Sequence, residues 1–258
     1  MAWSENPPRP CGIAVMAKAS LPGKTKTRLV PPLTFEEAAA FNTAFLKDVA
    51  ANMSAAGRAT PIDPYLAYGP PGTDGFFTAI LPAVGLIAAW HDNFGDCLFA
   101  AIAAMLARGH AGAVVLNSDS PTLPTALLVE TARALARPGD RAVLGPSRDG
   151  GYYLLGLKAP HRRLFEDVAW STEHVARETR ERAAEIGLDV HVLPEWYDVD
   201  DLAALRVLRD ELLGEPAHAP RLAPHPAAHT AELFGDLLAR TDLAARLDGA
   251  PAMRRAAG

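Results

Sequence analysis

The sequence predicts a three-layer α/β/α sandwich built on a mostly parallel, mixed sheet. Short apolar runs of strand length alternate with longer segments of helical character, and 49% of the residues are hydrophobic. Near-continuous apolar strands that alternate with helices are typical of a sheet covered by helices on both faces. A chain of 258 residues is also long enough to bury one sizeable core.

Seven apolar runs are predicted to be strands. In chain order they begin at Cys11, Pro64, Gly85, Ala113, Arg141, Tyr152 and Asp189. Helices are predicted for the segments that start at Thr34, Phe94, Pro124, Ser171 and Asp200. The first of these helices begins with Thr34 and Glu37 at the spacing of a capping box, in which each side chain bonds the backbone of the other residue.

The composition changes after Gly214, where Pro, Ala and His become frequent. We therefore divide the chain into an N-terminal arm (1–10), an α/β domain (11–214), and a linker with a short helical tail (215–258). The core is expected to be complete by Leu213, so that truncation after Gly214 leaves a folded domain. Alternatively, the tail docks on the domain or on a second subunit, which would make an oligomer. Three histidines of this region are interpreted as part of a spacer rather than as a metal cluster: His218, His225 and His229.

Charge and cysteine content narrow the class of protein. The formal net charge of −5 argues against nucleic acid or an acidic membrane surface as the partner, since both require clustered Lys and Arg. Cys11 and Cys97 are the two cysteines, and their spacing indicates neither a disulfide framework nor a zinc site. No apolar stretch reaches the roughly 18 residues of a membrane span, and no signal peptide is recognisable. We expect a soluble, cytoplasmic protein.

The loop after the first strand, "KASLPGKTKTRL", concentrates positive charge. Gly23 permits a tight backbone path, and Lys24, Lys26 and Arg28 can turn toward one anion, such as a diphosphate or triphosphate. The glycine spacing of a P-loop is missing. The alternative is a solvated loop with incidental charges.

Acidic residues follow three other strands, where an open α/β sheet binds its ligands. Asp119, in "NSDSPTLP", is suited to Mg²⁺ or Mn²⁺, which prefer oxygen ligands and bridge carboxylates to phosphates; otherwise it caps the next helix. Asp149 precedes two glycines, which admit a ligand close to the backbone or form a hairpin turn. The last group, Asp198, Asp200 and Asp201, would repel one another unless a cation or a helix N-terminus compensates them.

Five motifs taken together resemble a bacterial family of glycosyltransferase-A-like proteins. They are MAKASLPGKTKTRL, NSDSPTLP, LGPSRDGGYYLLGL, LFEDVAWST and WYDVDDLAAL, in this order. The family belongs to the nucleotide-diphospho-sugar transferase superfamily and is related to 2-phospholactate guanylyltransferase and molybdenum cofactor guanylyltransferase. The resemblance covers residues 11–212 and implies the fold of that superfamily, which includes both nucleotidyltransferases and glycosyltransferases.

The resemblance also implies roles for individual residues. The nucleotide donor would be bound by Gly23, Lys24, Lys26 and Arg28. The metal would be bound by Asp119, Asp198 and Asp200. Lys24, Asp119 and Asp149 would act in catalysis. The acceptor side would be lined by Gly150, Gly151, Tyr152, Trp170, Ser171 and Thr172. The sequence departs from the family pattern at Asn117, where Gly is expected, at Asp201, where Thr is expected, and near Cys97, where a basic residue is expected.

Two reactions fit these residues. In nucleotidyl transfer, a small anionic acceptor attacks the α-phosphate of a nucleoside triphosphate, and the cationic loop stabilises the departing pyrophosphate. In glycosyl transfer, a nucleoside diphosphate leaves a sugar, and Asp149 orients or deprotonates an acceptor hydroxyl. The cationic loop slightly favours nucleotidyl transfer. A non-catalytic nucleotide-binding module is the third hypothesis, and the presence of both Asp198 and Asp200 favours an enzyme over it.

Overall fold

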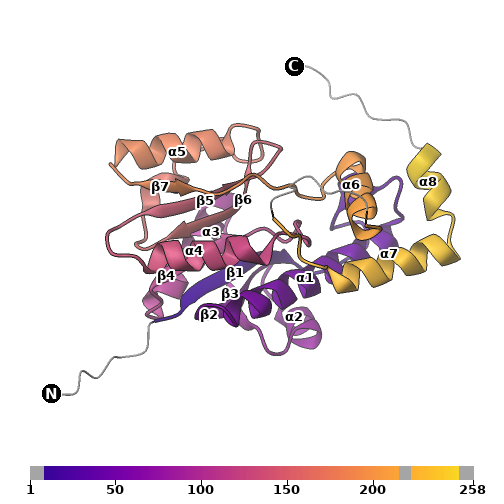
Figure 1. The fold of residues 1–258 in the computed structure, drawn as a ribbon, viewed down its shortest axis with the longest axis horizontal. Coiled ribbons are helices and arrows are strands. Elements are labelled where there is room, and N and C mark those ends of the chain that lie inside the picture. The colour runs from indigo at the N-terminus through magenta and orange to yellow at the C-terminus, as the bar shows by residue number, and fades with distance from the viewer. Residues whose placement is uncertain (1–8, 215–221, 250–258) are drawn as a thin grey trace.

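The computed structural model describes residues 9–214 and 222–249, and it confirms the predicted three-layer fold. Most of the expected N-terminal arm and the linker segment 215–221, with His218, lie outside the described residues. Figure 1 shows the central sheet between two layers of helices. None of the helices in the described parts of the chain combines the length and the apolar character that crossing a bilayer requires.

The sheet has seven strands in the order β3-β2-β1-β4-β6-β5-β7. They are β1 (Cys11–Lys18), β2 (Ile62–Gly69), β3 (Gly85–Ala88), β4 (Gly112–Leu116), β5 (Ala142–Pro146), β6 (Tyr152–Leu157) and β7 (Val190–Val192). β6 is antiparallel to β4 and β5, and every other pairing is parallel. Each predicted run lies on one of these strands, because a buried parallel strand is apolar on both faces.

The helices form the two outer layers. They are α1 (Phe35–Gly57), α2 (Asp74–Ile80), α3 (Phe94–Ala107), α4 (Thr125–Ala136), α5 (Val175–Glu185), α6 (Leu202–Leu212), α7 (Ala228–Arg240) and α8 (Leu243–Gly249), with 3₁₀ turns η1 (Thr27–Leu29) and η2 (Arg162–Phe165). Apolar residues of α1, α4, α6, α7 and α8 share one core cluster, and those of α3 and α5 share the other. The sequence did not predict α2.

Two predicted helix starts can be compared with the structure. The capping box of α1 is present: Glu37 N donates to Thr34 Oγ1 over 3.1 Å, and Thr34 N donates to Glu37 Oε2 over 2.8 Å. The predicted start of α5 at Ser171 is wrong, since the helix begins at Val175. Ser171 has a φ of 66°, a left-handed conformation that a regular helix does not contain.

The order of the strands brings two predicted loops together. From β1 the chain goes outward to β2 and β3, and it then crosses back to β4 on the other side of β1. Val15 of β1 pairs with Leu116 at the end of β4, and both strands run the same way. The cationic loop after Lys18 therefore begins beside the loop that holds Asp119. In open α/β sheets, this point of reversal is where ligands bind.

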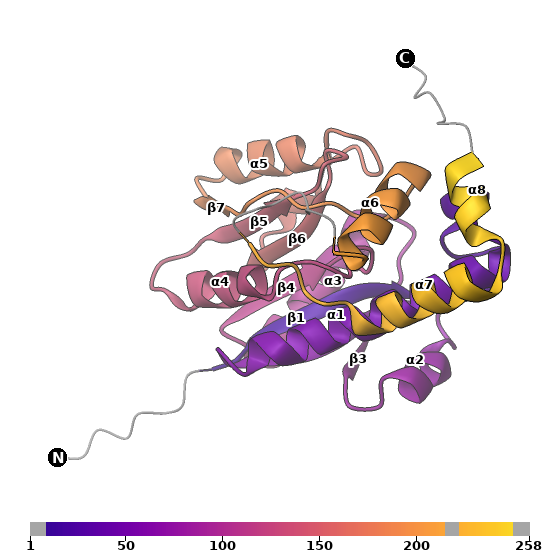
Figure 2. The ribbon, with the colours of Figure 1, turned by 45° about the vertical axis from the view of Figure 1, so that its right-hand side comes forward.

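The C-terminal tail packs on the outside of α1 (Figure 2). The carboxylate of Asp48, which is buried in α1, accepts hydrogen bonds from the backbone N–H groups of His229, at 2.9 Å, and Thr230, at 2.8 Å, and from the Thr230 hydroxyl. These N–H groups belong to the first turn of α7, where the backbone has no partner within the helix. Phe234 packs edge-on against Phe41, with ring centroids 5.1 Å apart.

Helix α8 is tied to the start of α1 by Arg246. Its guanidinium makes two parallel hydrogen bonds with the Glu37 carboxylate, at 2.8 and 2.7 Å, and it also donates to the carbonyl oxygen of Pro32. The Arg246 hydrogen bonds outweigh burial and lower the pKa of Glu37 below its usual value. The tail thus holds the segment that follows the cationic loop, as the docking alternative expects, and a domain that folds without the tail stays a prediction.

We predict that Asp48→Ala lowers the free energy of unfolding by about 3 kcal/mol, because it leaves buried N–H groups of α7 without an acceptor. Chemical denaturation measures this loss. Asp236→Ala on the exposed side of α7 is the control and should change stability by less than about 0.5 kcal/mol. Truncation after Gly214 should destabilise the chain at least as much as Asp48→Ala. A truncated chain as stable as the full chain would confirm the original expectation.

Candidate functional site

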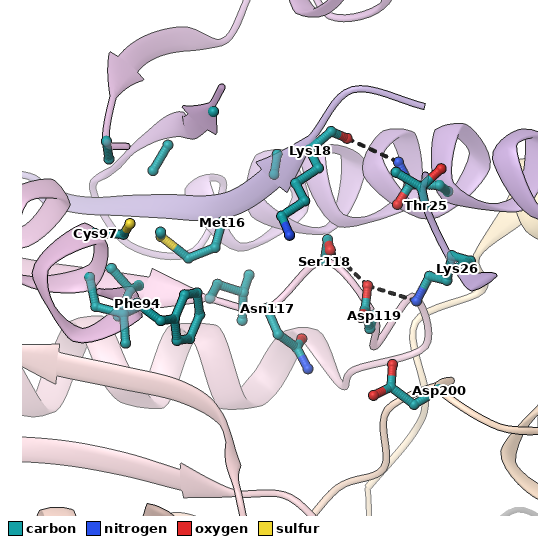
Figure 3. A pocket seen from close by; sticks show the side chains of 18 of the residues that line it. Met16, Lys18, Thr25, Lys26, Phe94, Cys97, Asn117, Ser118, Asp119 and Asp200 are labelled. Carbon is teal, nitrogen blue, oxygen red and sulfur yellow. Dashed lines mark hydrogen bonds and ion pairs between the residues drawn. The ribbon is translucent and has the colours of Figure 1, made fainter. Parts of the chain in front are cut away.

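A cavity of about 400 Å³ lies at the carboxyl ends of β1 and β4. Its polar end is formed by the cationic loop and the Asp119 loop, and its other end is largely apolar (Figure 3). Sequence-predicted site residues in its lining are Lys24, Lys26, Arg28, Asp119, Tyr152 and Asp200. The structure therefore brings together residues that are up to 176 positions apart, from Lys24 to Asp200, at one side of the sheet.

Lys26 does not extend freely into this cavity. Its ammonium nitrogen lies 2.7 Å from Asp119 Oδ1 and donates over 3.0 Å to the carbonyl oxygen of Val199. The Lys26 side chain is 4% exposed and its ammonium group lies 4.9 Å from the centre of the Phe45 ring. A φ of 53° directs the loop so that this side chain turns inward. Lys26 thus neutralises Asp119 in this structure, and its predicted contact with the phosphates of a donor stays a prediction.

The acids around Asp119 differ in how readily they ionise. Burial alone would raise the pKa of Asp119, but the Lys26 ammonium and a hydrogen bond from Ser118 bring it below its usual value. Burial and the Asp119 charge raise the pKa of Asp200, although Arg28 lies 3.3 Å away. Burial, followed by the charges of Asp149, Asp200 and Asp119, raises the pKa of Asp198 to about 7. Asp198 and Asp200 therefore hold their protons more tightly than a free aspartate does, whereas Asp119 ionises more readily.

The opposite end of the cavity is apolar and aromatic. Trp90 and Phe94 are about half exposed there, and Met16 and Cys97 form part of the wall. Trp90 lies against Gly69, where an added Cβ would come within 2.1 Å of the indole ring. The Lys18 ammonium lies 6.0 Å from the centre of the Trp90 ring and points into the cavity (Figure 3). A flat aromatic ligand with an anionic group would find partners at both ends.

A second cavity of about 390 Å³ adjoins the first. Both are lined by Arg28, Phe94, Tyr152 and Asp200. The remainder of its wall comes from two loops, one before β6 and one before α5: Asp149, Gly151, Trp170, Ser171, Thr172, Glu173 and Val175. Two adjoining cavities with a shared wall can hold two reactants side by side.

Three predicted site residues line neither cavity, and two of them shape the loops instead. Gly23 has a φ of 72° with open space around it, so it serves the left-handed turn. Gly150 has a φ of 88°, and an added Cβ would lie 2.1 Å from the Glu173 carbonyl oxygen. This close approach joins the two loops of the second cavity. The third residue, Asp198, lies near Asp149, Asp200 and Asp119, whose charges raise its pKa.

Sequence reasoning missed several residues of the lining. Lys18 is the last residue of β1 and Trp90 follows β3 by two positions, so the rule that ligands bind beyond strand ends would have identified both. Phe94 and Glu173 carry no such signal, because helix and loop packing bring them to the wall. Asn117, at the end of β4, donates to Ser120 Oγ over 3.1 Å.

Comparisons with known proteins extend this description. Residues 52–172 match the family described as "Uncharacterized protein conserved in bacteria (DUF2064)". No curated protein matches the chain. A solved structure from Desulfovibrio desulfuricans G20, provisionally assigned as a nucleotide-diphospho-sugar transferase, is similar with a TM-score of 0.74 and 26% identity, over 89% of this chain and 95% of that chain.

Two structures with less sequence similarity have a related fold. CMP:2-keto-3-deoxy-manno-octonic acid synthetase, solved with CTP, has a TM-score of 0.51 and 14% identity, over 80% of this chain and 99% of that chain. A cytidylyltransferase from Leptospira borgpetersenii has a TM-score of 0.53 and 11% identity, over 95% of this chain and 100% of that chain. The fold is that of the nucleotide-diphospho-sugar transferases, as the sequence resemblance implied. The relation to the two guanylyltransferases stays a prediction.

We predict that Asp198→Asn stabilises the protein more at pH 8 than at pH 5. Between about pH 4, the usual pKa of an aspartate, and pH 7, folded Asp198 keeps a proton that the unfolded chain has lost. The free energy of unfolding therefore falls as pH rises, by up to about 1.4 kcal/mol per unit from this group. The asparagine side chain of the variant does not ionise, so the variant does not lose this part of its free energy of unfolding as the pH rises.

Denaturation of the wild type and of the variant at both pH values tests this prediction. Asp92→Asn, on the exposed segment before α3, is the control and should follow the wild type at both pH values. An equal stability difference between Asp198→Asn and the wild type at pH 5 and pH 8 would contradict the prediction.

Proposed function

We propose that this protein is a transferase that uses a nucleotide donor, assisted by Mg²⁺ or Mn²⁺. The observation that carries the proposal is the first cavity, whose lining combines an aromatic, apolar end with four cationic residues and two carboxylates. The nucleobase would lie between Trp90 and Phe94, and Lys18, Lys24 and Arg28 would bind the phosphates. The similarity to a Desulfovibrio protein assigned as a nucleotide-diphospho-sugar transferase supports the same class.

The donor set suits a divalent cation that is held partly by substrate. Among the described residues, no group of three or more His, Cys, Asp or Glu side chains is placed to hold a metal. Mg²⁺ is usually bound by one or two carboxylates, with phosphates and water as its other ligands, and Asp119 and Asp200 fit that role. Lys26 lowers the pKa of Asp119, so that this carboxylate is ionised and able to bind a cation, which would share it with the ammonium group. A bound Mg²⁺ or Mn²⁺ would neutralise charge on the phosphates.

Two reactions remain candidates. The cations of the first cavity favour nucleotidyl transfer with release of pyrophosphate. Glycosyl transfer is favoured by Asp149, which lines the second cavity and can accept a proton from an acceptor hydroxyl. A non-catalytic module that binds only a nucleotide does not need a second cavity beside the first, so the second cavity favours an enzyme over such a module. The free, buried Cys11 and Cys97 agree with a reducing compartment, and we propose the cytoplasm.

We predict that one donor class binds when the full chain is titrated with Mg²⁺ and each of the four nucleoside triphosphates or a panel of nucleotide sugars. Lys24→Ala and Lys18→Ala should each weaken binding about 10- to 100-fold, since each removes a charge-assisted contact of about 1.5 to 3 kcal/mol. Arg180→Ala, which removes an exposed charge on α5, is the control. Release of pyrophosphate from the bound donor would identify nucleotidyl transfer. Release of a nucleoside diphosphate would identify glycosyl transfer. Binding of neither class would refute the proposal.

We predict that Asp119→Asn removes the thermal stabilisation that Mg²⁺ plus the bound nucleotide gives the wild type. The variant alone should also be less stable by about 2 kcal/mol, because Lys26 loses its counter-ion in a buried position. Adding Lys26→Met, whose side chain packs on Phe45, should restore most of that stability but not the response to ligand. An equal ligand-induced shift in wild type and Asp119→Asn would remove Asp119 from the metal site.

A further inference from the structure

The second cavity differs from the first in its charge. Three carboxylates line it, those of Asp149, Glu173 and Asp200, whereas Arg28 is its one cationic lining residue among those that the structure describes. Arg28 already faces Asp200 at 3.3 Å. A ligand in this cavity is therefore surrounded by excess negative charge.

The charge remains after a donor binds in the first cavity. A divalent cation held by Asp119 and Asp200 would be offset by the phosphates of the donor itself, and Asp149 and Glu173 would still face the second cavity without a compensating cation. Arg148, the residue before Asp149, is not part of the lining and lies 3.7 Å from Glu195. An anionic acceptor, as the sequence led us to expect, would meet repulsion from several sides.

The remaining wall suits a molecule with hydroxyl groups and an apolar face. Phe94 is 50% exposed and meets Trp170 edge-on, with centroids 5.7 Å apart. The Tyr152 hydroxyl, at the boundary of the two cavities, is buried without a hydrogen-bond partner among the described residues. A hydroxyl group can donate to the carboxylates and accept from Tyr152 or Arg28. An ammonium group would be attracted by the carboxylates, but it has no lone pair with which to accept from Tyr152 or Arg28, so a hydroxyl group is the one that can use both kinds of partner.

We infer that the second cavity binds an uncharged polyhydroxy compound, a sugar or a polyol, as the acceptor. This inference rests on the proposed function, which it deepens by naming the acceptor class. In the reaction, an acceptor hydroxyl oxygen forms a bond to the transferred group of the donor. The bond from that group to the departing nucleoside diphosphate or pyrophosphate breaks, and its electron pair leaves with that phosphate. The hydroxyl proton passes to the Asp149 carboxylate.

Direct binding to the full chain tests the inference without any donor. Ligand-observed NMR compares glucose, galactose and glycerol, each with its own monophosphate ester. At least one uncharged compound should bind 10-fold or more tightly than its ester, and raising the salt concentration should narrow the difference, because repulsion of the ester is screened. Tighter binding of the esters, or no binding of any uncharged compound, would overturn the inference.

A variant that removes one negative charge from the second cavity provides a second test of the inference. Glu173→Gln should strengthen binding of the esters several-fold and leave the uncharged compounds within about 2-fold. Glu181→Gln, on the exposed surface of α5, is the matched control and should change neither. Unchanged ester binding in Glu173→Gln would also overturn the inference. Failure of every nucleotide to bind would refute the proposed donor function, whereas these arms report on the acceptor cavity alone.

Discussion

The ion pair between Lys26 and Asp119 holds the site together. It connects the loop after β1 to the loop after β4, and Lys26 also donates to the Val199 carbonyl on the segment before α6. The Val199 N–H in turn donates to the backbone carbonyl of Asp119 over 2.8 Å. Three segments that are distant in sequence therefore meet at one charged contact. Because the Lys26 side chain is almost fully buried, loss of either partner would leave an uncompensated charge.

This pair also changes the electrostatics of the cationic loop. Of its three cations, Lys26 is used within the protein and Arg28 lies near Asp200, so Lys24 is the one that the structure leaves fully at the cavity surface. Lys18, from β1, adds to it on the opposite side. The positive charge available to a donor therefore comes from Lys18 at the end of β1 and from Lys24 in the loop that follows. A divalent cation that binds Asp119 has to compete with the Lys26 ammonium, which links cation binding to the position of the loop.

The tail supports the same loop from its other end. Glu37 belongs to the capping box of α1 and to the bidentate pair with Arg246, while Asp48 holds the first turn of α7. At one end of the loop Lys26 is held by Asp119, in the loop after β4, and at the other end the start of α1 is held by α8. The tail is therefore connected to the site through the start of α1 and the loop that precedes it.

Much of the fold could be predicted from the sequence alone. Buried parallel strands are apolar on both faces, so the runs at Cys11, Ala113 and the five others identified all seven strands. Local hydrogen bonds also have local signals: the Thr34–Glu37 spacing predicted the start of α1. The start of α5 was missed because the left-handed Ser171 is held by packing of its loop against Gly150, a contact between distant residues.

The sequence likewise determined which residue types gather near the site, because strand ends of a parallel sheet share one edge. It identified Lys24, Arg28, Asp119 and Asp200, which line the first cavity, and Asp149, which lines the second. Only the tertiary structure decided how these charges pair. Lys26 faces a carboxylate because Asp119, which is 93 positions further along the chain, lies beside it in the fold. No local pattern encodes that distance, since it is fixed by the packing of whole strands and loops.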